Sequence, residues 1–203
     1  MPRQSIAPRL AAPLAVFALA LTACNGENAT PHATQSATTQ AKPSPSTTAS
    51  GAALIPGDSV SGKVQEDDGV ITYSVSAQKI DFGTEAQAKA VVQDPADAKG
   101  KVLAIARVRY THAAGPTLTS STDADDSTTV WADGQRGAIL LGSPTSTPGC
   151  DDPYDIDSWK TGESHTICEF YLIPAAAKQA EVHWTPSDTT ENPYVWTFPG
   201  PGA

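Results

Sequence analysis

Short stretches of alternating apolar and polar residues fill the last three quarters of the chain. Residues 70–77, VITYSVSA, place Ile71, Tyr73 and Val75 on one side and mostly hydroxyl side chains on the other. Residues 101–112, KVLAIARVRYTH, alternate in the same way. Because successive side chains of a strand point to opposite faces of a sheet, both stretches predict half-buried antiparallel strands.

A turn and a short helix punctuate this pattern. Asp133-Gly134 lies between two apolar runs in TTVWADGQRGAILLG and predicts a β-hairpin. Residues 84–92, TEAQAKAVV, predict a short helix, because Thr84 and Gln87 have the spacing of a capping box. Further strands are predicted at 60–64, 165–173, 180–184 and 194–198. About seven or eight short strands separated by turns predict an all-β, antiparallel sandwich over residues 54–203.

Three stretches carry a family resemblance: 69–83 (GVITYSVSAQKIDFG), 100–112 (GKVLAIARVRYTH) and 159–174 (WKTGESHTICEFYLIP). They resemble the uncharacterised immunoglobulin-like domains of secreted actinobacterial lipoproteins, which are similar in shape to mycobacterial secreted immunogenic antigens. The middle stretch departs from the family pattern, since THAAG replaces its usual Asn-Thr-Gly ending. The resemblance implies an immunoglobulin-like sandwich and an extracellular address, and it implies no established activity.

The first 23 residues have the organisation of a signal peptide. Arg3 and Arg9 precede a 12-residue apolar run, 10–21, which is too short to span a membrane. The run ends in Leu-Thr-Ala followed by Cys24, which resembles the bacterial lipobox. The resemblance implies cleavage before Cys24 and a diacylglycerol on its thiol, although a cysteine near an ordinary cleavage site is the alternative. Two acyl chains anchor a protein stably, so we expect Cys24 to hold the protein at the extracytoplasmic face of the cell membrane.

Residues 24–53 predict a disordered tether. From residue 25 onward this stretch has no large aliphatic and no aromatic residue, and it is rich in Thr, Ser, Ala and Pro. Such a segment buries too little apolar surface to offset the entropy lost on ordering. The same composition is also typical of O-glycosylated stalks.

The negative net charge of the chain argues against nucleic acids and anionic lipids as partners. The formal net charge is -9, and loss of the two leader arginines makes the processed form more negative still. A surface of this sign repels phosphate groups, so we expect no nucleic-acid partner and no binding to bare anionic lipid headgroups.

Cys150 and Cys168 form an even pair once Cys24 carries lipid. In an oxidising compartment such a pair predicts a disulfide, with two free thiols as the alternative. The bridge would close a loop that contains the acidic stretch 151–157, DDPYDID. We therefore expect it to pin this loop to the sandwich.

The loop next to this bridge is the candidate ligand site. Loops carry function on rigid scaffolds, and this one combines carboxylates with aromatic residues. For Trp159 a place in the core is the alternative, and for Trp184 and Trp196 the core is the expected place. The candidate ligand residues are Asp151, Asp152, Tyr154, Asp155, Asp157 and Trp159. The carboxylates of this loop and of a second acidic stretch, 123–126, could also supply oxygen ligands for Ca²⁺. Neither stretch matches the calcium-loop consensus. We therefore expect both loops to be solvated and assign no metal site.

The candidate catalytic residues of the sequence do not form a recognisable active-site motif. Ser76 and Lys79, together with Lys-Thr-Gly at 160–162 and Ser-Asp-Thr at 187–189, mimic the motifs of penicillin-recognising serine enzymes. In those enzymes the Ser and Lys share a helix face, whereas here they are expected on opposite faces of a strand. His112, His165 and His183 fall on separate strands. We therefore expect no enzyme activity and no cofactor, and favour a lipid-anchored surface module that binds an unknown envelope component or ligand. A small envelope hydrolase or a solute-binding lipoprotein is the alternative.

Overall fold

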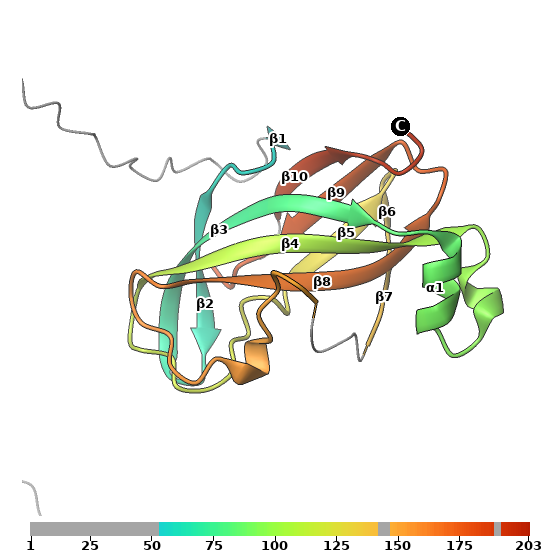
Figure 1. Ribbon diagram of the computed structural model, residues 1–203. Helices are drawn as coiled ribbons and strands as arrows, with labels where there is room; N and C mark the ends of the chain where they lie inside the picture. The colour runs from blue at the N-terminus through green and yellow to red at the C-terminus, as the bar shows by residue number, and fades with distance from the viewer. Residues whose placement is uncertain (1–52, 142–146, 189–191) are drawn as a thin grey trace, which may run out of the picture. The chain divides into compact units, whose positions relative to one another are not determined.

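A computed structural model describes residues 53–141, 147–188 and 192–203 of the protein (Figure 1). The predicted signal peptide, the predicted lipidation site Cys24 and residues 25–52 of the predicted tether lie outside the described residues. Among the described residues no helix combines the length and the apolar character needed to cross a membrane.

Two five-stranded sheets face each other as a sandwich (Figure 1). The first sheet has the order β2 (Val60–Glu66), β3 (Gly69–Phe82), β4 (Lys101–Ala114), β8 (Ser164–Pro174) and β7 (Ala138–Ile139). The second has the order β1 (Ala53–Leu54), β10 (Tyr194–Pro199), β9 (Gln179–Trp184), β5 (Thr128–Ala132) and β6 (Gln135–Arg136). Neighbours are antiparallel except β1 and β10, which run parallel. The expected all-β sandwich is confirmed, and its described part has seven strands of five or more residues and three of two residues.

The predicted alternation accounts for the core. Ile71, Tyr73 and Val75 of β3 have no exposed surface, and the inward residues of β4 are buried as well. Trp184 and Trp196 are fully buried, as expected, and each indole nitrogen finds a carbonyl acceptor, Ala124 O at 3.0 Å and Asp58 O at 2.9 Å, respectively. Large aromatic side chains whose polar atom is satisfied are the strongest contributors to such a core.

The hairpin at Asp133-Gly134 forms, but its second arm is short. Both residues have positive φ, 46° and 78°, as a type I′ turn requires. The arm β6 has two residues, after which the chain leaves this sheet and β7 pairs with β8 of the other one. Gly137 permits the crossing, because a Cβ there would lie 3.0 Å from Ile173 Cγ2 and 3.1 Å from a backbone carbonyl.

The predicted helix is α1 (Glu85–Val91), and its capping box is present. The backbone N–H of Gln87 donates to the Thr84 hydroxyl at 3.2 Å, and the Gln87 side-chain oxygen accepts from the Thr84 N–H at 2.8 Å. A short 3₁₀ turn, η1 (Pro95–Ala98), follows. Ala88 of the helix packs with Ala98 and Leu172 in a second, small apolar cluster.

One carboxylate is buried inside the sandwich with its charge fully hydrogen bonded. Glu66 is 3% exposed. Its oxygens accept from the Tyr73 hydroxyl at 2.7 Å, the Thr122 hydroxyl at 2.8 Å and the Asp123 N–H at 2.8 Å. Three donors compensate a buried carboxylate for the water that it has lost.

Candidate functional site

The disulfide between Cys150 and Cys168 is present, with the two Cα atoms 5.6 Å apart, which confirms the sequence prediction. It joins the segment before the 3₁₀ turn η2 (Pro153–Asp155) to strand β8. Beside it, the N–H of Asp151 donates to the Thr166 carbonyl at 2.7 Å. The acidic loop is therefore fixed to β8 both by the disulfide and by this backbone hydrogen bond.

An outward-facing arginine braces the same loop from β4. The Nη1 of Arg107 donates to the Pro148 carbonyl at 2.8 Å and approaches the Cys150 sulfur at 3.3 Å. Its Nε is ion-paired with Asp81 of β3 at 2.7 Å. Arg107, which contacts the loop, is therefore itself held in place by Asp81 of the neighbouring strand.

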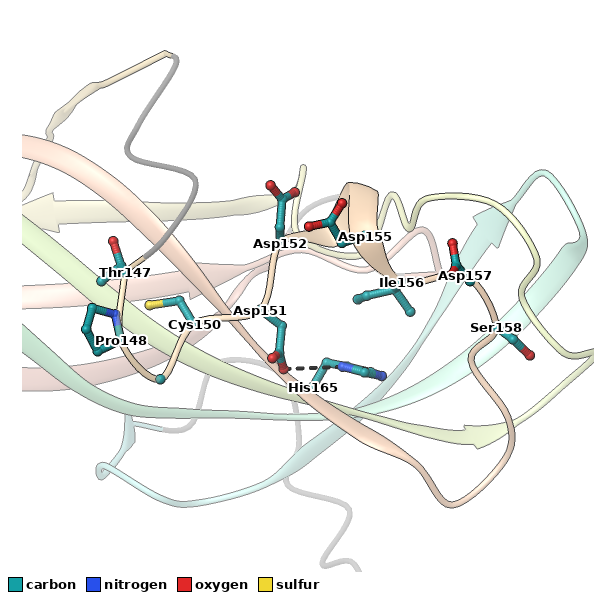
Figure 2. Close-up of a pocket in the computed structure, with 11 residues that line it drawn as sticks. Thr147, Pro148, Cys150, Asp151, Asp152, Asp155, Ile156, Asp157, Ser158 and His165 are labelled. Carbon is teal, nitrogen blue, oxygen red and sulfur yellow. Dashed lines mark hydrogen bonds and ion pairs between the residues drawn. The ribbon is translucent and has the colours of Figure 1, made fainter.

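An open depression of about 860 Å³, the outer basin, lies along this loop (Figure 2). Four of the six predicted ligand residues line it: Asp151, Asp152, Asp155 and Asp157. Asp151 is the one that meets a basic side chain in the basin, since its Oδ2 lies 3.2 Å from Nδ1 of His165 (Figure 2). Asp151, Asp155 and Asp157 are exposed, so water solvates their charges.

The other two predicted ligand residues lie elsewhere. Trp159 has no exposed surface, so it belongs to the core and not to a ligand surface. Its ring packs 5.2 Å from that of Tyr73, and its indole N–H donates to the Glu163 carbonyl at 3.1 Å. Tyr154 is 83% exposed and lines a different hollow.

This second hollow, the edge cleft, has a volume of about 350 Å³ and combines apolar walls with carboxylates. It lies where β8, the segment after β7, the acidic loop and the turn before β5 meet. Its apolar lining includes Ile139, Leu140, Leu141, Tyr154, Ile167 and Phe170, and its acidic lining is Asp125, Asp126, Asp151, Asp152 and Glu169.

Glu169 stands on the inner face of β8. It is paired in register with Ala106 of β4, whose side chain has no exposed surface and lies in the core. Residues directly opposite in an antiparallel pair project from the same face of the sheet. Glu169 therefore points toward the second sheet, in the same row as the buried Ile167 and Tyr171.

The pKa values of two carboxyl groups in the cleft are strongly raised. Burial, together with the negative charges of Asp125 and Asp126, raises the pKa of Glu169 to about 8. Burial also raises the pKa of Asp125 to about 7, against the effect of a hydrogen bond from its own backbone N–H, and the neighbouring charges of Asp126 and Glu66 add to the rise. Strongly perturbed carboxyl groups in a cleft are characteristic of functional sites.

Sequence reasoning missed Glu169, although a signal was available. In HTICEFYLI, the residues that alternate with Cys168 and Phe170 are Ile167, Glu169 and Tyr171, so a carboxylate occupies an inward position of the strand. Asp125 belongs to the acidic stretch 123–126 that the sequence singled out, but its approach to β8 depends on the tertiary fold and could not be predicted.

Ser76 and Lys79, which mimic a motif of penicillin-recognising enzymes, each contact another side chain. The prediction that they lie on opposite faces of the strand was wrong. A bulge between Ala77 and Lys79 puts Ser76 and Lys79 opposite Arg109 and Arg107, respectively, and so on the same face of the sheet. The Ser76 hydroxyl accepts from the Gln78 side chain at 2.8 Å, and Lys79 is ion-paired with Asp81 at 2.9 Å. In these positions the amine is held by a carboxylate rather than by the hydroxyl.

The three strand histidines each have a polar partner. His112 is fully buried, with its Nε2 lying 2.7 Å from the Pro116 carbonyl. His165 meets Asp151, and His183 meets Glu181 at 2.7 Å. Within the described residues, no group of three or more His, Cys, Asp or Glu side chains is arranged to hold a metal ion.

Comparisons with known proteins give no family for this chain. No family model matches the sequence, and no curated protein does. Among solved structures, the fold is similar to a candidate lipoprotein of Bacillus subtilis, with TM-score 0.45 and 10% identity, over 69% of this chain and 38% of that one. A candidate lipoprotein of Staphylococcus aureus is similar with TM-score 0.46 and 7% identity, over 68% of this chain and 92% of that one. Neither likeness is strong enough to support an inference about this chain, and the resemblance to actinobacterial domains stays a prediction.

Proposed function

We propose that the protein is a non-catalytic binding module, held at the extracytoplasmic face of the membrane by a lipid on Cys24. The observation that carries the proposal is the disulfide-pinned loop, which separates two hollows and exposes Tyr154 and several carboxylates on a rigid sandwich. A binding loop that is ordered before it meets its ligand loses little entropy on binding. The disulfide also suits an oxidising compartment, which is consistent with the leader that the sequence predicts.

A small envelope hydrolase is the second candidate, and one observation favours it. Two carboxyl groups with raised pKa values face one cleft, as in enzymes that use a general acid. Against this, the cleft lies on a single sandwich and has the volume of a small-molecule site rather than of a groove for a polymer.

Anchoring is tested by comparing the wild-type protein with Cys24→Ala after metabolic labelling with an alkyne fatty acid. The wild-type chain is expected in the membrane fraction, labelled and without residues 1–23. The variant is expected to be unlabelled and to leave the membrane fraction. Recovery of wild-type protein from cytosol with Met1 still in place would overturn the proposed address.

Binding is tested by photo-crosslinking in living cells with benzoylphenylalanine in place of Tyr154. The matched control carries the same probe in place of Val70, which is 51% exposed on β3. We expect a discrete adduct from position 154 that position 70 does not give. Identical patterns from both positions, or no adduct from either, would contradict a binding role for this loop.

A further inference from the structure

We propose that the edge cleft binds a small organic cation, a primary ammonium or guanidinium group on an apolar stem, with Glu169 and Asp125 as its carboxylate partners. This inference rests on the proposed role as a binding module and names the class of ligand. It requires that the two acids can accept further hydrogen bonds, that the walls of the cleft can contact an apolar stem, and that a metal ion fits less well.

Both acids have fewer hydrogen-bond partners than a buried carboxylate ordinarily has, since the one donor to Asp125 is its own backbone N–H among the described residues. Within the described residues, Asp125 Oδ1 is buried without a hydrogen-bond partner. No hydrogen bond or ion pair to the Glu169 carboxylate is found in the same part of the chain, whereas Glu66 receives three donors. Buried polar groups are almost always hydrogen bonded. Asp125 Oδ1 is buried without a donor, and the half-buried Glu169 has none within the described residues, which leaves room for a donor from outside the chain.

The lining of the cleft has one sign of charge. Five acidic side chains line it, and no Lys, Arg or His is among its lining residues. Clefts that carry one sign of charge concentrate ligands of the opposite sign. Ionising Glu169 and Asp125 is unfavourable because burial removes part of their water. A bound cation would offset this penalty, because an ammonium–carboxylate contact is stronger away from water than in it.

Apolar side chains make up part of the exposed lining of the cleft, beside the exposed Asp126 and Asp151. In the described structure six large hydrophobic residues are exposed, and three of them line this cleft: Ile139 at 50%, Leu141 at 87% and Tyr154 at 83%. Exposed apolar residues gathered at one place mark a binding site more reliably than scattered ones. The combination fits a ligand with a charged head and an apolar stem.

A divalent metal ion fits the cleft less well. Ca²⁺ takes six to eight oxygen ligands and Mg²⁺ near-ideal octahedral geometry. No group of three or more potential ligands is close enough to hold a metal among the described residues. An ammonium group has three N–H donors and a guanidinium group five, and neither demands a fixed coordination shell, so the carboxylates of Glu169 and Asp125 can accept from either group while other donors face water.

The experiment is isothermal titration calorimetry of the full-length protein in mild detergent with benzylammonium. Benzyl alcohol, which has the same stem without the charge, is the matched neutral ligand. We expect saturable binding of benzylammonium, none of benzyl alcohol, and about tenfold or greater weakening in Glu169→Gln. Asp97→Asn, which removes an exposed carboxylate of η1 that lines neither hollow, is expected to bind as the wild type does. A lysine-containing tripeptide amide, titrated in parallel, distinguishes a free amine from a partner's side chain as the source of the cation.

The proposal is overturned if benzylammonium does not bind, if benzyl alcohol binds equally well, or if Glu169→Gln binds with wild-type affinity. It is also overturned if Ca²⁺ binds in this cleft and excludes the amine. A thermal melt of Glu169→Gln shows whether the variant is folded, and Asp125→Asn provides a second variant of the same site. Failure here leaves the anchoring and position-154 crosslinking results intact, so the two proposals fail separately.

Discussion

Replacement of Glu169 by Gln should stabilise the fold at neutral pH while it removes the proposed cation partner. Glu169 faces the core side of β8 and carries a carboxyl group whose pKa is raised from 4.5 to about 8, mainly by burial. A carboxyl group with a raised pKa contributes stability that is fully present below its unfolded pKa and lost as the pH rises through its folded pKa. The relevant window for Glu169 is therefore from about pH 4.5 to about pH 8.

The magnitude follows from the size of this shift. Each unit of pKa shift corresponds to about 1.4 kcal/mol, so the folded protein should lose on the order of 4 kcal/mol between about pH 5 and pH 8 through Glu169. Asp125, whose pKa is raised to about 7, adds a loss of the same sign. A neutral amide of nearly the same shape removes the first contribution and leaves the second.

The assay is urea unfolding of the protein, followed by tryptophan fluorescence at several pH values in this window. Three buried tryptophans provide the signal, Trp159, Trp184 and Trp196. We expect the free energy of unfolding of the wild type to fall as the pH rises, and that of Glu169→Gln to fall much less. Asp157→Asn, at an exposed position, is the control and should follow the wild type.

Parallel pH profiles for the wild type and Glu169→Gln would refute the reasoning, because they would show that the Glu169 carboxyl group titrates as in water. A variant that is less stable than the wild type at about pH 8 would also refute it. In that case the ionised carboxylate would be stabilised by a contact that the amide cannot make.

Three further predictions concern stability and are measured by urea unfolding. The double variant Cys150→Ser/Cys168→Ser should lose about 3 kcal/mol, because the bridge closes a loop with a sequence separation of 18 residues; an unchanged midpoint would show that the other contacts of the loop suffice. Glu66→Gln should lose about 2 kcal/mol, since an amide cannot accept all three donors, and a neutral result would mean that this network rearranges around an amide. Gly62→Ala should lose about 1–3 kcal/mol, because its Cβ would lie 2.5 Å from Pro186 Cγ, and wild-type stability would indicate that the proline moves aside freely.

Local signals in the sequence were sufficient for much of the fold. The alternation around Tyr73, the capping box of Thr84 and the Asp133-Gly134 turn each depend on residues within a few positions of one another. The disulfide could also be predicted, because Cys150 and Cys168 were the remaining pair. The first three features are local, and the disulfide follows from the number of cysteines in the chain.

Contacts between distant segments could not be predicted in this way. The short return arm after Gly134 and the bulge that puts Ser76 and Lys79 on one face depend on which strand pairs with which and in what register. The same holds for Trp159, whose place in the core is decided by packing against Tyr73 rather than by its acidic neighbours.

By itself, then, the sequence was enough to predict a mostly β-stranded body and a bridged acidic loop, and it fixes a negative net charge, because composition and short-range periodicity carry that information. Only the tertiary structure decided that Glu169 and Asp125, 44 positions apart, line one cleft and lose their water there. Desolvation is a property of everything that surrounds a group in space, and most of those surroundings come from other parts of the chain.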